Sequence, residues 1–233
     1  MNWFVHFSEH GLQELALGFM ALVYTIRIVW FLHFKAGTER QGQTGAPTTT
    51  PTKGILYSWA NIAMPWAMES TRTKYFLYLQ FVVFHVGVAA AILLSFVIPY
   101  LPALLANRGV VLAFQIITAA ACAVGLIRMV RRIGSPYMRA ISSPDDYFSL
   151  VLLTLWLFSA VVAAPFGAME TQELTTAGTG IRLSFFLMTA FFLIYVPFSK
   201  ISHYLYYPFT RYYFGKTMGY RGVYPVRHKP KTG

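Results

Sequence analysis

The sequence predicts an all-α integral membrane protein, a bundle of five transmembrane helices with its N-terminus outside and its C-terminus in the cytoplasm. Of the 233 residues, 56% are hydrophobic and only 12% are charged, and the mean hydropathy is +0.51. A soluble domain typically carries about 25% charged residues. The charged residues also lie in short stretches between long apolar runs, so they are too few to cover a water-facing surface.

Five apolar runs approach the length of about 20 residues that a membrane-crossing helix needs. They are Leu12–Phe34, Tyr75–Tyr100, Gly109–Ile127, Tyr147–Met169 and Ile181–Tyr207. The third run is short, and the fifth is long enough to tilt or protrude. The expected segments are therefore an outer N-terminal segment (1–11), a first helix (12–34), a cytoplasmic linker with an interfacial part (35–74), a region of four helices (75–207) and a cytoplasmic tail (208–233).

The orientation follows from the distribution of Lys and Arg. With five spans, one side of the membrane receives 17 of the 19 bases, and the other side receives only Arg108 and Arg182. Cytoplasmic loops carry the excess of bases in membrane proteins. The bases flank the spans and do not gather on one folded face, so the net charge of +11 does not indicate nucleic-acid binding.

The expected loop after the first helix has two parts. Residues Gly37–Gly54 are rich in Gly, Thr and Pro, as in a flexible linker. Residues Ile55–Met68 are apolar and aromatic but too short to cross a membrane. We expect this second part to lie at the membrane interface, anchored by Tyr57, Trp59 and Trp66.

The run SSPDDYF predicts the start of the fourth helix. Ser143 can cap it, Pro144 suits the first helical position, and Asp145 and Asp146 favour the positive end of the helix dipole. Two adjacent carboxylates can also serve in acid–base catalysis, but capping accounts for every residue of the run.

Histidine supplies the candidates for chemistry within the apolar runs. His85 and His203 both fall in such runs, where an imidazole without a partner is costly. Two imidazoles on facing helices can ligate a haem iron, or each can bond to a neighbouring helix; the residues alone favour neither. Gly87, two residues after His85, would remove bulk beside a porphyrin, and Pro197 should bend the helix before His203. The single cysteine, Cys122, cannot hold a disulfide or an iron–sulfur cluster within this chain.

Three segments resemble the gamma (cytochrome b) subunit of respiratory nitrate reductase. FVVFHVGVAA around His85 is similar to the second helix of that family, and VPFSKISHYLYYPFTRYYFG around His203 is similar to its fifth helix. RRIGSPYMRAISSPDDYFSLVLLTL is closer to the branch that pairs with heterodisulfide-reductase-like or sulfite-reductase-associated iron–sulfur subunits.

The resemblance implies one haem b with His85 and His203 as its axial ligands. In the members with two haems, the second ligand pair corresponds here to Ser95 and Phe185, which is beside Ser184. Neither position offers an imidazole, so we expect a single haem. His6 or His10 remains an alternative ligand for a second one.

These expectations lead to a membrane cytochrome b subunit that passes electrons between a quinone, menaquinone or ubiquinone, and a cytoplasmic iron–sulfur partner. The membrane would be the inner membrane of a bacterium or archaeon. Four bases near its inner edge are candidate partners for the haem propionates or, equally, anchors at the membrane interface: Arg131, Arg132, Lys200 and Arg211. The candidate quinone residues are Arg108, near the outer face, and His33, near the inner face, which we favour.

Two other classes of function remain in view. The first is a haem-free membrane anchor that tethers a peripheral redox enzyme. The second is a small transporter, which the lack of central charges and of internal repeats disfavours. In either redox hypothesis the resemblance implies assembly with a cytoplasmic partner. The cytoplasmic face is also basic and aromatic, but the orientation alone predicts most of its bases.

Overall fold

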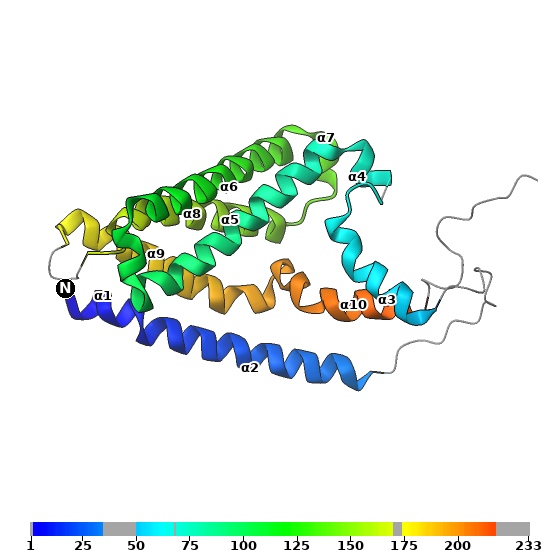
Figure 1. Ribbon diagram of the computed structural model, residues 1–233, viewed down its shortest axis with the longest axis horizontal. Coiled ribbons are helices and arrows are strands. Elements are labelled where there is room, and N and C mark those ends of the chain that lie inside the picture. The colour runs from blue at the N-terminus through cyan, green and yellow to red at the C-terminus, as the bar shows by residue number, and fades with distance from the viewer. Residues whose placement is uncertain (1, 35–49, 68, 170–173, 218–233) are drawn as a thin grey trace, which may run out of the picture. The chain divides into compact units, whose positions relative to one another are not determined.

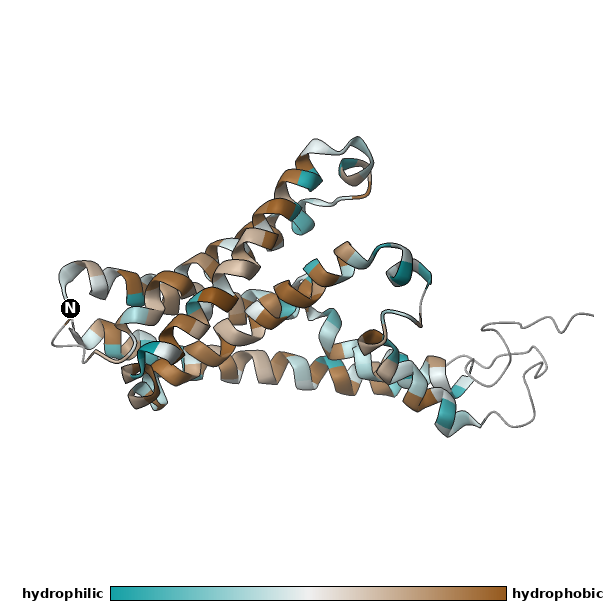
Figure 2. Ribbon diagram, turned by 45° about the horizontal axis from the view of Figure 1, so that its top comes forward, coloured by the Kyte–Doolittle hydropathy of each residue, from teal (hydrophilic) through white to brown (hydrophobic). Residues whose placement is uncertain are grey.

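The computed structural model describes residues 2–34, 50–67, 69–169 and 174–217, and within these ranges it contains helices and no strands. Five helical stretches are long and apolar enough to cross a membrane: Trp3–His33, Tyr75–Tyr100, Arg108–Gly134, Pro144–Phe166 and Thr176–Phe198. The helical class and the five predicted spans are therefore confirmed. Apolar residues run along these long helices, and hydrophilic residues concentrate near their ends (Figure 2). Most of the predicted linker, the last part of the tail and His228 lie outside the described residues.

The chain forms two compact units, each described here by itself. The first comprises residues 1–26 and 79–201, and the second comprises residues 27–78 and 202–233. The first contains α1 (Asn2–Glu9), most of α2 (Gly11–His33) and α5 (Tyr75–Tyr100), α6 (Arg108–Gly134), α7 (Pro136–Ala140), α8 (Pro144–Ala163) and α9 (Thr176–Tyr195). The second contains the remaining turns of α2 and α5, together with α3 (Pro51–Ala60), α4 (Glu69–Thr73) and α10 (His203–Thr217).

Small residues let the helices of the first unit approach closely. A Cβ added to Gly87 of α5 would lie 2.0 Å from the Cβ of Ala121 in α6, and one added to Gly125 of α6 would lie 2.5 Å from Thr154 Oγ1 in α8. Helices α6 and α8 accordingly run side by side (Figure 1). Close backbone approach through small residues is how helices pack inside membranes, where burial of apolar surface gives no net drive.

The core between α8 and α9 is aromatic. Trp156 is fully buried; its ring stacks on that of Phe192 at 5.0 Å between centroids, and its Nε1 donates to Thr189 Oγ1 at 2.8 Å. Because the indole N–H has this partner, burying it carries no penalty for an unmade hydrogen bond.

The fifth span ends earlier than the sequence predicts. The apolar run continues to Tyr207, but α9 ends at Tyr195 and is followed by two short 3₁₀ segments, Val196–Phe198 and Lys200–Ser202. Pro197 lies in the first of these segments, and Ser199 between them has extended backbone angles (φ −98°, ψ 170°). Proline lacks an N–H and cannot continue the α-helical ladder. The expectation that Pro197 bends one helix is thus wrong, since the helix stops there and α10 starts afresh at His203.

In the second unit, α3 and α10 pack with their backbones in contact. A Cβ added to Gly215 of α10 would lie 2.4 Å from the Cα of Ile55 and 2.6 Å from the carbonyl oxygen of Gly54. Trp59 Nε1 of α3 also donates to the carbonyl of Pro208 in α10 at 2.9 Å. Segments nearly 150 residues apart in the chain are therefore joined into one helical pair.

Candidate functional site

His85 lies on the exposed side of α5, between residues that pack against the rest of its unit. Its neighbours Phe84 and Gly87 are buried, whereas the His85 side chain is exposed. His85 Nδ1 lies 2.7 Å from the backbone carbonyl oxygen of Phe81, one turn earlier, and the two rings are 4.1 Å apart between centroids. An imidazole that faces outward from a membrane-crossing helix is uncommon and is a functional candidate by its position alone.

The hydrogen bond at His85 defines the tautomer of its ring. A carbonyl oxygen only accepts, so Nδ1 carries the proton, and in the neutral ring the lone pair lies on Nε2. Metal-ligating histidines commonly donate one ring N–H to a backbone carbonyl, which orients the ring and leaves the other nitrogen for the metal. The donor chemistry of His85 therefore fits ligation of iron through Nε2.

Gly87 has a different role from the one expected. Its missing side chain is matched by Ala121 of α6, whose Cβ occupies the space that a Cβ of Gly87 would fill. The glycine therefore serves the contact between α5 and α6, and helix packing accounts for it without a porphyrin.

His203 is the first residue of α10 and is exposed. It was expected inside the fifth span but lies beyond the break that follows α9. His85 and His203 belong to different units, and the structure describes each within its own.

Asp145 at the start of α8 is bonded to residues on both sides of the break after α9. Asp145 accepts hydrogen bonds from the Tyr195 hydroxyl and from the backbone N–H of Lys200 at 3.1 Å. Tyr195 also bonds to the Ser149 hydroxyl at 2.9 Å. We call Asp145, Ser149, Tyr195 and Lys200 the α8–α9 clamp. The clamp holds the backbone of Lys200, after α9, against the start of α8.

Ser143 is the N-cap of α8, as predicted, and Asp146 completes a capping box with it that was not predicted. Its carboxylate accepts from the backbone N–H of Ser143 at 2.7 Å and from the Ser143 hydroxyl at 2.8 Å. It also accepts from Lys200 Nζ at 2.8 Å and lies 3.8 Å from Arg132 Nη1. Two of the four candidate propionate partners, Lys200 and Arg132, are thus brought together on Asp146.

The other two candidate propionate partners are separate. Arg131 is exposed in the last turn of α6, and Arg211 of α10 lies over the Tyr207 ring at 5.3 Å. Sequence reasoning missed Arg128, whose guanidinium lies 5.2 Å from the centre of the Phe84 ring, next to His85. Its spacing of three and four residues from Arg131 and Arg132 places it on the same helix face, which is the signal that could have found it.

The candidate quinone residues occupy helix ends. Arg108 is the exposed first residue of α6, where Asn107 caps the helix by accepting from the Gly109 N–H at 2.8 Å. His33 is the exposed last residue of α2, and its ring meets that of Phe34 edge-on at 5.9 Å. The two residues belong to different units.

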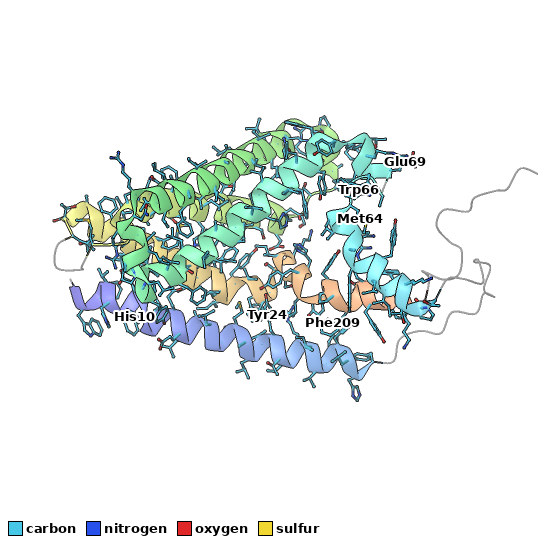
Figure 3. All side chains as sticks on the ribbon, viewed as in Figure 1. His10, Tyr24, Met64, Trp66, Glu69 and Phe209 are labelled. Carbon is cyan, nitrogen blue, oxygen red and sulfur yellow. The ribbon has the colours of Figure 1, made fainter. Side chains whose placement is uncertain are left out.

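The positions discussed for a second haem take part in packing. Phe185 is fully buried beside Trp156, at 6.3 Å between ring centroids, and Ser95 donates to the carbonyl of Ile92 at 2.7 Å. The rings of His6 and His10, one turn apart, lie 4.7 Å apart between centroids with their planes tilted by 33°, and His10 lies where α1 gives way to α2 (Figure 3).

A buried ion pair near His10 was not predicted. Arg182 of α9 binds Glu9 of α1 through Nε at 2.7 Å and Nη2 at 2.6 Å, and its Nη1 donates to the carbonyl of Met169 at 2.7 Å. Both side chains are only 4% exposed. The signal was an arginine inside an apolar run, because such a charge needs a partner.

Two further polar contacts involve the first turn of α2, which follows α1. The Tyr100 hydroxyl at the end of α5 donates to Glu14 Oε1 at 3.0 Å, and the Tyr100 ring meets that of His10 edge-on at 5.4 Å. Gln13 Nε2 donates to the carbonyl of Phe186 in α9 at 2.8 Å. Polar bonds therefore join the first turn of α2 to both α5 and α9.

Comparison of the chain with protein-family models, with curated proteins and with solved structures found no match. Within the described residues, no group of three or more His, Cys, Asp and Glu side chains could hold a metal ion.

Proposed function

We propose that the protein is a membrane cytochrome b subunit, which passes electrons between a membrane quinone and a cytoplasmic iron–sulfur partner through one haem b. The axial ligands would be His85 and His203. The observation that carries the proposal is the His85 imidazole on a membrane-crossing helix, with its Nδ1 bonded to the Phe81 carbonyl. That bond would orient the ring and place its proton on Nδ1, so iron would be ligated through Nε2.

Haem b would supply one-electron redox chemistry at its iron, and the chain would supply orientation and charge. Arg128 is the base best placed to pair with a propionate near His85, because it lies against the adjacent Phe84 ring. Arg131 and Arg211 remain candidates. Lys200 and Arg132 are weaker ones, since both interact with Asp146.

The second ligand would depend on the α8–α9 clamp. His203 follows Lys200 by three residues, and the Lys200 backbone is bonded to Asp145. A residue that must ligate a metal needs a supporting shell that holds it in place. The clamp would contribute to that support, because it holds the backbone of Lys200, three residues before His203.

The proposed orientation has the N-terminus outside and the C-terminus in the cytoplasm of a bacterial or archaeal cell. It rests on the uneven distribution of Lys and Arg. Fusion of alkaline phosphatase and, separately, of a fluorescent protein to the C-terminus tests it. Fluorescence without phosphatase activity is expected. Strong phosphatase activity would show that the C-terminus lies outside and that the proposed orientation is wrong.

For the quinone we propose the inner side of the membrane near His33, with the outer side near Arg108 as the alternative. A single haem at His85 and His203 would lie toward the inner side, so an inner quinone would be closer to its iron. The expected iron–sulfur partner would bind on the same side, where the bases are concentrated.

A haem-free anchor is the second candidate, and one observation favours it. Ala121 fills the space beside Gly87 that a porphyrin was expected to use. The anchor would tether the same class of peripheral redox enzyme without carrying electrons itself.

The absorption spectrum of the protein purified from its native membrane separates the two. We expect a reduced b-type spectrum and one haem per chain by the pyridine haemochrome assay. His85→Ala and His203→Ala should each abolish the low-spin signal, whereas the controls His6→Ala and Ser95→Ala should keep it. Protein without haem would favour the anchor, and two haems per chain or a full signal in His85→Ala would refute the ligand assignment.

A further inference from the structure

The pair formed by α3 and α10 is fastened to the ends of two membrane-crossing helices. Phe31, in the last turns of α2, packs on α10 against the rings of Tyr206 and Phe209, at 5.7 Å and 5.9 Å between centroids. Phe209 of α10 and Met64, which follows α3, are labelled in Figure 3. Tyr78, at the start of α5, donates its hydroxyl to the carbonyl of Ile62, just after α3. The helical pair therefore packs against the ends of two helices that are long and apolar enough to cross a membrane.

Both helices of this pair expose large apolar and aromatic side chains. The contact side of α3 is made by Gly54 and Ser58, which are buried, while Leu56, Tyr57 and Trp59 are 59%, 54% and 42% exposed. On α10, three further large side chains are 43–49% exposed: Tyr204, Tyr212 and Phe214. We call these six side chains the aromatic face. Tyrosine and tryptophan are enriched at the boundary between lipid and water, where an apolar ring can be buried while its polar atom stays wet.

The described part of the second unit is rich in bases, and one of them lies against a ring of the aromatic face. In the described part of the second unit, the only acid is Glu69, against the bases Arg27, Lys53, Arg72, Lys74, Arg211 and Lys216. Lys216 Nζ lies 5.6 Å from the centre of the Tyr212 ring, which itself is 6.4 Å from that of Trp59. Exposed rings with cations beside them are typical of helices that lie on anionic membranes.

We propose that α3 and α10 together form an interfacial helical pair that binds the anionic phospholipid headgroups of the membrane the protein crosses. The rings of the aromatic face enter the headgroup region, and the flanking lysines and arginines contact phosphate. Lipid is the favoured occupant because the helical pair is attached to the end of α2 and to the start of α5. This inference does not depend on the haem.

A spin label on the full-length protein tests the insertion. Cys122→Ala removes the only cysteine, and Leu56→Cys then introduces a label at an exposed position of α3. The protein is placed in bilayers of phosphatidylcholine alone or mixed with phosphatidylglycerol. Power saturation compares collisions of the label with oxygen, which concentrates in lipid, and with a water-soluble nickel chelate. Phe214→Cys provides a second site on α10, and Arg139→Cys on α7 provides the control.

With phosphatidylglycerol present, labels at positions 56 and 214 should collide with oxygen several-fold more than in phosphatidylcholine and be shielded from nickel. The label at position 139 should stay accessible to nickel in both bilayers. Replacing Lys53 and Lys216 with Gln should remove the dependence on phosphatidylglycerol, whereas Arg139→Gln should leave it. Nickel access at positions 56 and 214 in both bilayers would overturn the proposal. So would shielding that occurs only in the native complex, since it would assign the face to a protein partner.

Discussion

Arg182 and Glu9 form an ion pair whose side chains are both 4% exposed, whereas at the other end of α9 Lys200 and Asp146 form one in which they are 60% and 20% exposed. The first pair joins α9 to α1, and the second joins the segment after α9 to the start of α8. Both connect parts of the first unit that are distant in the chain. They differ in what surrounds them.

The difference in exposure changes what each pair contributes. A buried charge loses its hydration, and removal of one partner leaves the other charged and unpaired, which typically costs about 3–5 kcal/mol. An exposed pair keeps most of its hydration and is screened by salt, so it typically contributes about 0.2–1 kcal/mol. The buried pair therefore sets how α1 and α9 meet. At the other end, the position of the chain depends more on the hydrogen bonds of Asp145 than on the charge of Lys200.

The largest expected effect is that of Arg182→Met. It leaves the Glu9 carboxylate buried without its cation and removes the bond to the Met169 carbonyl, so the free energy of unfolding should fall by about 3–5 kcal/mol. Unfolding by denaturing detergent, followed by circular dichroism, measures it. The double variant Glu9→Leu with Arg182→Met should recover much of the loss, because no charge is then left buried. A loss below about 1 kcal/mol in the single variant would mean that the pair is hydrated.

The next effect is that of Asp145→Ala, which removes the acceptor shared by the Tyr195 hydroxyl and the Lys200 backbone N–H. We expect a loss of about 1–2 kcal/mol, since a removed acceptor leaves donors unpaired but these groups are only partly buried. If His203 is a haem ligand, the reduced absorption band should also weaken. The variant Tyr195→Phe supplies the double-mutant cycle. Purely additive losses would show that Asp145 and Tyr195 do not act together.

Hydropathy was sufficient to predict the five spans but not the end of the last one. Tyr204, Tyr206 and Tyr207 continue the apolar run after Pro197, so a count of apolar residues does not register the break. The cap at Asp146 was predictable because its partner Ser143 is three residues away. The other roles depend on residues that are far apart in the chain. Glu9 and Arg182 are separated by 173 residues, and Gly87 meets Ala121 of another helix.

The same limit applied to the candidate site. The chemistry of His85 and the bases near the helix ends could be read from residue types and spacing. That Lys200 and Arg132 meet on Asp146 follows from how α6 and the segment after α9 pack against the start of α8, and that Arg128 lies beside Phe84 follows from how α6 packs against α5. Neither could be read from the sequence.

The smallest expected effect is that of Lys200→Met. Like Arg182→Met, this change removes the cation of an ion pair at one end of α9. Asp146 keeps the backbone N–H and the hydroxyl of Ser143, and Arg132 remains 3.8 Å away, so the carboxylate is not left without partners. The Lys200 backbone bond to Asp145 is also unaffected by the change of side chain. We expect a loss of less than about 1 kcal/mol, which high salt should abolish. The same salt series on Arg182→Met should leave its loss largely unchanged, because a buried pair is screened much less. Equal losses in the two variants, with equal dependence on salt, would show that exposure does not distinguish the two ends of α9.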